Sequence, residues 1–249
     1  LNTPKGGGKF YGFGASARLR ASLVLGADGM NSTVRHWLRT QSRARGSHSF
    51  SANRLSSDSA GLCFKMLALS IDSPLFEAKK AYAVRSTGSL SMGLLPVKEG
   101  VRRTVNFIAP PSHKIWDQKT PESLKLYLCS IFPQLDWNSF VTEEELERFA
   151  KAKTGIFPKP QWSDGLSCGF SANDSLESNG TTSACFLVGD AAHAFPPDLG
   201  QGINSGLEDV MTLATALDES HLCEEGLSDN RWLQRAVHLY GEKRLPDTV

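Results

Sequence analysis

The sequence predicts an α/β protein in which an open α/β layer is interrupted by a largely antiparallel insertion. Two short apolar runs, Leu23–Leu25 and Cys185–Val188, each end in a turn of glycine and aspartate, as strands do in open α/β sheets. Between these runs, residues 61–109 contain short apolar or alternating segments separated by turn residues, which is typical of antiparallel strands. We therefore expect two domains, one of residues 1–60 and 171–249 and one of residues 61–170.

Composition narrows the class of protein. Hydrophobic residues make up 40% of the 249 residues, enough for a core, and the net charge of +1 gives no sign of a nucleic-acid partner. The five cysteines are scattered and form no C-x-x-C pair, which argues against a disulfide framework or a metal site and for reduced thiols inside a cell. No membrane span or signal peptide is visible, and because the first residue is leucine we expect the termini to be incomplete.

The C-terminal motif combines a strand, a glycine-rich loop and a helix start. After Cys185–Val188 come Gly189 and Asp190, then a loop of proline and glycine, and a helix from about Ile203. The amides at a helix N-terminus lack intrahelical partners and carry a partial positive charge. This combination predicts a site for an anionic or electron-rich ligand.

The N-terminal motif follows Leu23–Leu25 and reads Gly26-Ala27-Asp28-Gly29, with Ser32 and Arg35 behind it. Asp28 stands just past the carboxyl end of a strand, where ligands bind in open α/β sheets. Asp28 could also be a turn aspartate that caps a helix, and Arg35 a surface arginine.

These two motifs carry a family resemblance. GDAAHAFPPDLGQGINSGLED and GADGMNSTVR resemble the second flavin-binding motif and the GADG-x-x-S-x-V-R motif of the single-component, FAD-dependent aromatic hydroxylases. Weaker similarity over Phe149–Phe170 and Tyr240–Asp247 favours the kynurenine 3-monooxygenase-like branch. The resemblance implies a Rossmann-like FAD-binding domain with an inserted substrate domain. It also implies NADPH or NADH as co-substrate and hydroxylation of an aromatic or similarly electron-rich small molecule.

By the same resemblance, the N-terminal motif would meet FAD and the nicotinamide nucleotide, and Asp190 would bind sugar hydroxyls of FAD. The helix start would lie near the flavin pyrimidine edge, with Pro197 beside the reactive face. His193 is expected to pack or hydrogen-bond locally and is given no catalytic role. The expected cofactor-binding residues are Asp28, Gly29, Arg35, Gly189, Asp190, Pro197, Gly200, Gln201, Gly202, Ile203 and Asn204.

The family normally begins with a strand, a G-x-G-x-x-G turn and a helix, and the sequence has no such unit. Gly12–Ala17 matches the letters, but the residues after it continue as a strand, so we interpret it as a loop or hairpin turn. Without this unit we expect weak FAD binding. Two alternatives to the monooxygenase therefore stay open: a non-catalytic binding module, and a flavin-dependent dehydrogenase or reductase.

The remaining elements follow from local patterns. We expect a loop over Thr40–Ala60, and helices that open at Thr120-Pro121 and at Thr142, the second with a capping box and a solvated run of glutamates. An apolar stripe from Ile203 to Leu217 is expected to pack against the sheet. Candidates for facing a substrate in the inserted domain are Arg85, Met92 and Phe107, although core packing or surface exposure is the simpler interpretation of each.

Overall fold

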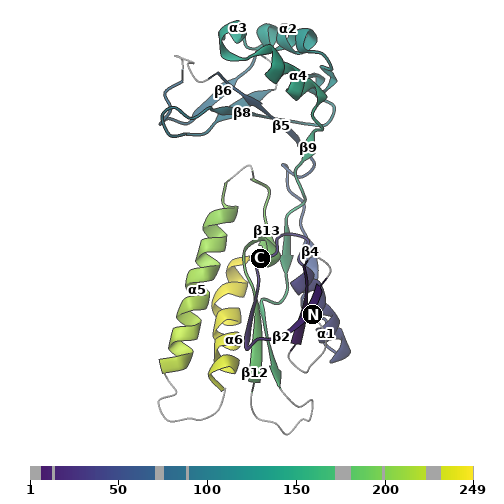
Figure 1. Cartoon of the computed structure of the whole chain (residues 1–249), viewed down its shortest axis with the longest axis vertical. Helices are drawn as coiled ribbons and strands as arrows, with labels where there is room; N and C mark the ends of the chain where they lie inside the picture. Colours follow the sequence, from purple (N-terminus) through teal and green to yellow (C-terminus); the bar gives the residue numbers. More distant parts are fainter. Residues whose placement is uncertain are drawn as a thin grey trace. The chain divides into compact units, whose positions relative to one another are not determined.

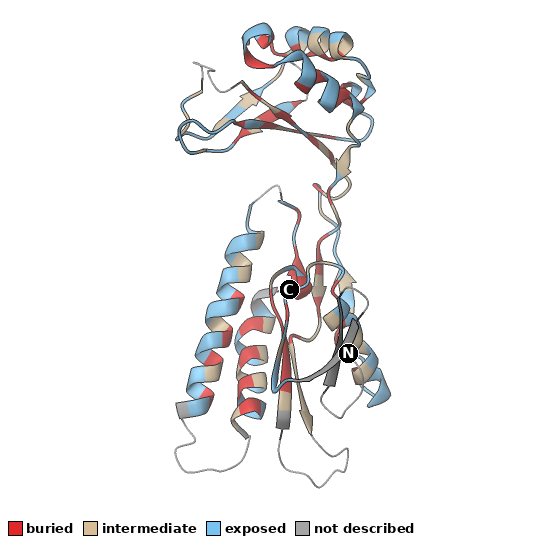
Figure 2. Ribbon diagram, viewed as in Figure 1, coloured by how far each residue is buried: buried red, intermediate tan, exposed pale blue. Residues whose placement is uncertain are grey.

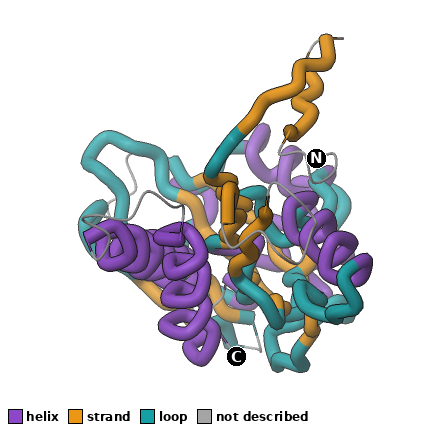
Figure 3. The backbone as a smooth tube through the Cα atoms, turned by 90° about the horizontal axis from the view of Figure 1, so that it is seen from below, coloured by secondary structure: helices purple, strands orange, loops and turns teal. Residues whose placement is uncertain are grey.

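The computed structural model describes residues 7–12, 15–70, 76–87, 90–171, 181–197, 200–222 and 231–248 (Figure 1). The chain forms two compact units. Unit 1 consists of residues 1–57 and 159–249, and unit 2 of residues 58–158. Figure 3 shows that the chain contains both helices and strands, and the predicted α/β class, with α+β elements, is confirmed.

The central sheet of unit 1 has the order β11-β12-β3. Its strands are β3 (Leu23–Gly26), β11 (Ser167–Ser171) and β12 (Thr181–Leu187). β12 pairs parallel with β3 and antiparallel with β11. Two C-terminal helices, α5 (Gly202–Leu222) and α6 (Arg231–Arg244), pack against each other, and α6 also contacts β11 and β12. The two predicted apolar runs are thus neighbouring parallel strands.

A second, small sheet of unit 1 joins β4 (Ala52–Arg54), β10 (Gln161–Ser163) and β13 (His193–Ala194) in the order β13-β10-β4. Because β10 pairs with both neighbours and β11 pairs with β12, residues 159–170 lie in unit 1, whereas the sequence placed them with the insertion. The loop expected over Thr40–Ala60 also needs correction. Helix α1 (Thr33–Ala44) continues to Ala44, and β4 is held by its pairing with β10.

The rejected dinucleotide fingerprint lies in a β-hairpin. Strand β1 (Gly7–Gly12) pairs antiparallel with β2 (Ala15–Arg20), on either side of residues 13 and 14, which are outside the described residues. A fingerprint needs a helix after the glycines, and a strand stands there instead. The rejection is therefore confirmed.

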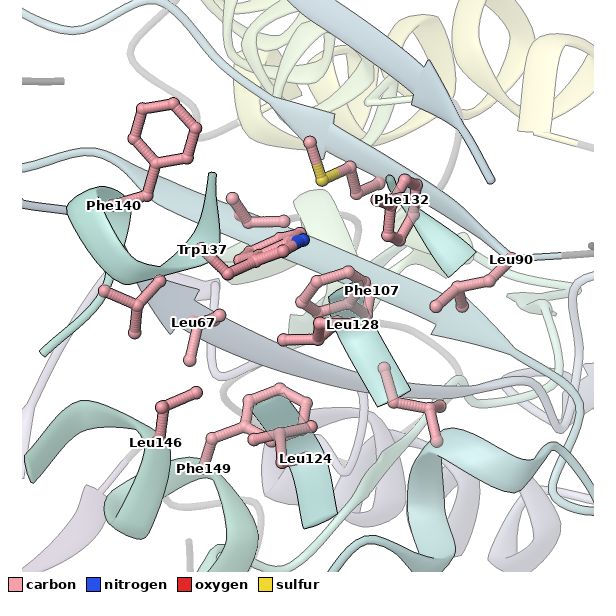
Figure 4. Close-up of a cluster of buried hydrophobic side chains, with 14 of the residues drawn as sticks. Leu67, Leu90, Phe107, Leu124, Leu128, Phe132, Trp137, Phe140, Leu146 and Phe149 are labelled. Carbon is pink, nitrogen blue, oxygen red and sulfur yellow. The ribbon is translucent and has the colours of Figure 1, made fainter. Parts of the chain in front are cut away.

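Unit 2 is a five-stranded sheet in the order β6-β7-β8-β5-β9, with helices against one face (Figure 1). The strands are β5 (Cys63–Ala68), β6 (Tyr82–Arg85), β7 (Ser91–Leu94), β8 (Thr104–Ala109) and β9 (Gly155–Ile156). The helices are the 3₁₀ turn η1 (Lys114–Asp117), α2 (Pro121–Ile131), α3 (Trp137–Phe140) and α4 (Glu143–Lys151). Aromatic and leucine side chains from both layers fill the space between them (Figure 4).

The core of unit 2 decides between the candidate substrate contacts. Met92 and Phe107 are buried among the side chains under the helices, so neither faces a ligand on the other side of the sheet. Arg85 pairs with Ser91, one position along from the pair of Val84 and Met92, and its side chain is exposed. Because neighbouring residues of a strand point to opposite faces, Arg85 lies on the face away from the helices.

The helix starts in unit 2 were predicted correctly, with one error. The hydroxyls of Thr120 and Thr142 accept hydrogen bonds from the amides of Ser123 and Glu145, at 3.2 and 3.4 Å. The carboxylate of Glu145, however, does not return to the cap and is not solvated. It is buried, and Oε1 accepts from the amide of Ala68 at 2.7 Å, so it joins α4 to β5.

The expected packing of the α5 stripe is wrong for most of its residues, although Leu217 at its end packs against the core of unit 1. Ile203 and Met211 are 73% and 71% exposed, and Leu207 and Val210 are also exposed. Figure 2 shows exposed residues along much of α5. At about 100° per residue, these side chains lie opposite the buried face of the helix. That face carries Asp209, Leu213, Ala216 and Ser220. Small side chains let α5 approach its neighbours closely, and the buried aspartate is fully bonded, so the less apolar face is the one that packs.

Two smaller findings concern membranes and cysteines. Within the described ranges, no helix combines the length and apolar character that crossing a membrane requires. The four cysteines in those ranges, Cys63, Cys129, Cys168 and Cys185, are free thiols, and Cys223 lies outside the described residues.

A candidate cofactor site at the ends of two parallel strands

The two predicted motifs come together at one edge of the central sheet. Leu187, the last residue of β12, is paired with Gly26, the last residue of β3, and the amide of Val188 donates to the Gly26 carbonyl at 3.0 Å. The turns that follow these strands therefore start side by side. In open α/β sheets, the carboxyl ends of parallel strands are where ligands bind.

Gly26 is required at this edge because the packing leaves no room for a side chain. A Cβ atom here would lie 2.7 Å from Leu187 Cδ2 and 2.9 Å from Val34 Cγ1. The glycine therefore lets the first turn of α1 pack directly onto the ends of both strands.

Asp28 is positioned by the start of α1. Its Oδ2 accepts hydrogen bonds from the amides of Thr33 and Val34, at 2.7 and 3.1 Å. Partial burial raises the pKa of Asp28, but hydrogen bonds from Ser32, Val34 and Thr33 outweigh it and hold the pKa below its ordinary value. The helix-capping alternative is thus realised, while the side chain remains exposed.

Arg35 is a buried cross-link between the two motifs, and the surface-arginine alternative is excluded. Its side chain is 7% exposed. Nη1 donates to the carbonyl of Ala191 at 2.6 Å and Nη2 to that of Met30 at 2.7 Å. Gln161 donates to the same Met30 carbonyl at 2.5 Å. Arg35 therefore ties the turn after β3 to the turn after β12, and its guanidinium points into the protein.

The turn after β12 leaves an aspartate free. Gly189 has φ +58°, in the left-handed region, and begins the 3₁₀ turn η2 (Gly189–Ala191). A Cβ on Gly189 would meet no atom within 4 Å. Asp190 is exposed, and its carboxylate has no hydrogen-bond or ion-pair partner among the described residues. A carboxylate accepts only, so this one is available for hydroxyl groups of a ligand.

The first turn of α5 lies against this turn. A Cβ on Gly206 would lie 3.5 Å from Gly189 Cα, which shows how closely the helix approaches η2. Gly200, with φ +64°, and Gly202 have open space where a Cβ would be. The α5 N-terminus therefore combines room for a ligand with the unpaired amides of a helix start.

The other predicted residues lie around this helix start. The side-chain amide of Asn204 donates to Gln201 Oε1 at 3.2 Å, and the carbonyl of Pro197 accepts from the amide of Gly200 at 3.1 Å. Ile203, Asn204 and Pro197 are exposed, and Gly29 after the first motif is half-buried. The predicted residues thus share one unit, with Arg35 as the one that is turned away from solvent.

A buried polar network supports the turn from behind. Asp209 of α5 has no exposed surface, and its carboxylate accepts three kinds of donor. Oδ2 accepts from the Gly189 amide at 2.6 Å and lies 2.7 Å from His193 Nε2, and Oδ1 accepts from Arg244 Nε at 2.6 Å. Arg244 Nη2 also donates to Ser205 Oγ at 2.8 Å. His193 bonds locally, as expected.

The sequence analysis missed the supporting residues Gln161, Ser205, Asp209, Tyr240 and Arg244. Tyr240 donates to the carbonyl of Leu187 at 2.8 Å, and burial raises its pKa above the ordinary value. Signals existed: Ser205 and Asp209 lie within the C-terminal motif GDAAHAFPPDLGQGINSGLED, and Gln161, Tyr240 and Arg244 lie in the two stretches of weaker similarity. Nothing in the spacing showed that Asp209 and Arg244, 35 positions apart, would meet.

Comparison with known protein families shows which family has this fold and this site. The model of the FAD binding domain family matches residues 9–229. The chain belongs to this family, whose ligand is FAD.

Individual relatives confirm the family resemblance that the two motifs carry. Kynurenine 3-monooxygenase acdD of Aspergillus candidus is 30% identical over 171 residues, which cover 61% of this chain and 33% of that protein. The kynurenine 3-monooxygenase of Emericella nidulans is 33% identical over 133 residues, 47% of this chain and 26% of that protein.

Solved structures show the same fold. PqsL, a probable FAD-dependent monooxygenase from Pseudomonas aeruginosa, has a TM-score of 0.53 at 21% identity, covering 93% of this chain and 54% of its own. Klebsiella pneumoniae HpxO, complexed with FAD and uric acid, has a TM-score of 0.54 at 19% identity, covering 99% of this chain and 53% of its own. The chain thus spans about half the length of these structures, and its matches cover about a third or less of the two relatives.

Proposed function

We propose that this chain is part of an FAD-dependent monooxygenase that uses NADPH or NADH and O₂ to hydroxylate an aromatic or similarly electron-rich small molecule. The observation that carries the proposal is the meeting of two motif turns at the ends of parallel strands β3 and β12. The free carboxylate of Asp190 and the start of α5 adjoin this point. The names of the relatives support monooxygenation and make kynurenine the first candidate substrate.

The residues present fit FAD at this site. Where Gly189, Gly200 and Gly202 would carry a Cβ, no protein atom lies within 4 Å, so the backbone is open to a ligand. The Asp190 carboxylate would accept hydrogen bonds from ribityl or ribose hydroxyls. The amides at the α5 start would stabilise negative charge at the pyrimidine edge of the flavin, with Asn204 and Gln201 beside them.

When bound, FAD supplies the redox and oxygen chemistry, and the protein supplies orientation and electrostatics. In unit 1, Arg35 fixes the distance between the two motif turns, and Asp28 holds the start of α1. No side-chain nucleophile is needed for this chemistry. We assign unit 1 to FAD binding and unit 2 to the substrate, which would meet the sheet face that carries Arg85 and is not covered by helices.

The first test measures flavin binding in the natural protein that carries these 249 residues. Asp190→Ala should weaken FAD binding without loss of thermal stability, because its side chain is exposed and its carboxylate has no hydrogen-bond or ion-pair partner among the described residues. Gly202→Val should weaken binding by filling the open space beside the backbone. Asp218→Ala, an exposed position farther along α5, is the matched control. Unchanged affinities in both site variants would remove the site assignment.

The second test measures the reaction. NAD(P)H consumption in air should rise when the right substrate is added, and one atom of labelled oxygen should enter the product. Kynurenine is the first compound to try. Substrate-dependent turnover without labelled product would favour a dehydrogenase or reductase, and bound FAD without any turnover would favour a non-catalytic module.

A further inference from the structure

One group of buried residues contacts no ligand in the proposed function. It consists of Asp209 and its three hydrogen-bond partners, the Gly189 amide, His193 and Arg244. Asp209, His193 and Arg244 are 0%, 1% and 2% exposed. They lie on α5, on β13 and at the end of α6, so the group joins three elements of unit 1. Charged side chains are rarely buried so completely unless they are paired.

The charges and protons of this group can be assigned from its geometry. Asp209 Oδ1 and Oδ2 lie 2.9 and 2.7 Å from His193 Nε2, and since a carboxylate only accepts, Nε2 carries the proton. His193 Nδ1 is buried and has no partner among the described residues, so a second proton there would be an unpaired N–H. His193 is therefore neutral, and the charge of Asp209 is balanced by Arg244.

The contact that matters for the site is the one to Gly189. The amide of Gly189 donates to Asp209 Oδ2 at 2.6 Å, a short charge-assisted bond in a buried place. Gly189 has φ +58°, and glycine populates many other conformations readily. The Asp209 carboxylate is a fixed acceptor behind the Gly189 amide and favours the observed conformation of Gly189. This conformation turns Asp190 outward. Through Arg244 and Ser205 the same carboxylate also fixes the first turn of α5.

We propose that Asp209, with Arg244 balancing its charge, is a positioning residue of the flavin site, because it sets the orientation of the Gly189–Asp190 turn. This inference rests on the proposed function for its purpose, but its geometry can be tested without flavin. Asp209 touches neither cofactor nor substrate; it acts through the backbone of Gly189.

The experiment compares Asp209→Leu with the pair Asp209→Leu/Arg244→Met. Leucine has the same number and branching of side-chain heavy atoms as aspartate and offers no acceptor, so the Gly189 amide loses its partner in both proteins. The single variant also removes the carboxylate nearest to the buried Arg244 guanidinium, at 2.6 Å, and leaves it the more distant Glu208 carboxylate at 3.4 Å. Loss of this partner is destabilising, whereas the pair removes both charges. The melting temperature should therefore fall in the single variant and recover in part in the pair. Ser220→Ala is the control, because Ser220 is buried on the same face of α5 and, among the described residues, its hydroxyl donates to the Ala216 carbonyl alone, at 2.6 Å.

Two measurements separate positioning from stability. The amide proton of Gly189, followed by NMR in the isotope-labelled 249-residue chain, should move upfield in both Asp209 variants and stay in place in Ser220→Ala. In the natural protein, the dissociation constant for FAD should rise about tenfold to a hundredfold in both Asp209 variants, the range for loss of one hydrogen bond to a charged group. The dissociation constant should stay raised in the double variant Asp209→Leu/Arg244→Met, although the melting temperature of this variant recovers in part.

An FAD affinity that recovers together with the melting temperature, or a Gly189 amide signal that does not move, would overturn the proposal. If the unaltered protein binds no FAD, the proposed function fails, and the NMR result alone decides whether Asp209 positions the turn.

Discussion

Replacing Arg35 by methionine tests whether the two motif turns depend on their cross-link. Methionine keeps most of the apolar stem but removes both donors. The buried carbonyl of Ala191 then loses its donor, which costs about 1–3 kcal/mol, while the Met30 carbonyl keeps Gln161 and loses about 0.5–1.5 kcal/mol more. We expect a total loss of about 1.5–4.5 kcal/mol in the free energy of unfolding. For a chain of this size, that corresponds to a fall of about 3–18 °C in melting temperature.

The assay is thermal unfolding followed by circular dichroism, with Arg43→Met as the matched control. Arg43 lies on the same helix, and its side chain is exposed. Arg35→Lys should fall between the two, because one ammonium group cannot reproduce the fork that reaches two carbonyls. If Arg35→Met costs no more than Arg43→Met, the cross-link does not hold the turns together and the reasoning about the site is wrong.

Two further predictions concern packing and pH. Gly26→Ala should destabilise unit 1 by about 1–3 kcal/mol, because the new Cβ would lie within 3 Å of Leu187 and Val34, as urea unfolding can measure. Glu145→Gln should lower stability at pH 7 by about 1–3 kcal/mol, since the buried carboxylate accepts from Ala68 and the Arg148 guanidinium. Burial raises the pKa of Glu145, but these partners hold it below the ordinary value, so its contribution is complete above about pH 5 and disappears as pH falls through the lowered pKa.

Each of these has a control in unit 2. Gly93→Ala adds a Cβ that meets no atom within 4 Å, so it should cost less than Gly26→Ala. Glu147→Gln, which changes a half-exposed carboxylate on the same helix, is the control for Glu145→Gln. Equal losses for the two glycines, or parallel stability curves below pH 5 for the unaltered protein and Glu145→Gln, would contradict the respective accounts.

Local chemistry determined much of this protein from the sequence alone. The strand at Leu23, the strand before Gly189, the four antiparallel strands of unit 2 and the helix starts after Thr120 and Thr142 all follow from patterns within a few residues. The motif residues around Asp28 and Asp190 could be found in the same way, because the residues that form a glycine turn or a helix start are close together in the sequence.

What only the tertiary structure decided depends on residues that are far apart in the chain. Periodicity gives a helix a stripe but does not say which face packs, and α5 buries the face of Asp209 and leaves Ile203 exposed. The sequence predicted Arg35 as a cofactor-binding residue and left a surface position open as an alternative, but only the fold showed that Ala191, 156 positions away, supplies its acceptor. A buried charge is stable only when its partners are in place, and those partners are set by the fold. The sequence therefore determined the turns of the proposed flavin site, and the tertiary structure determined the buried side chains that hold them.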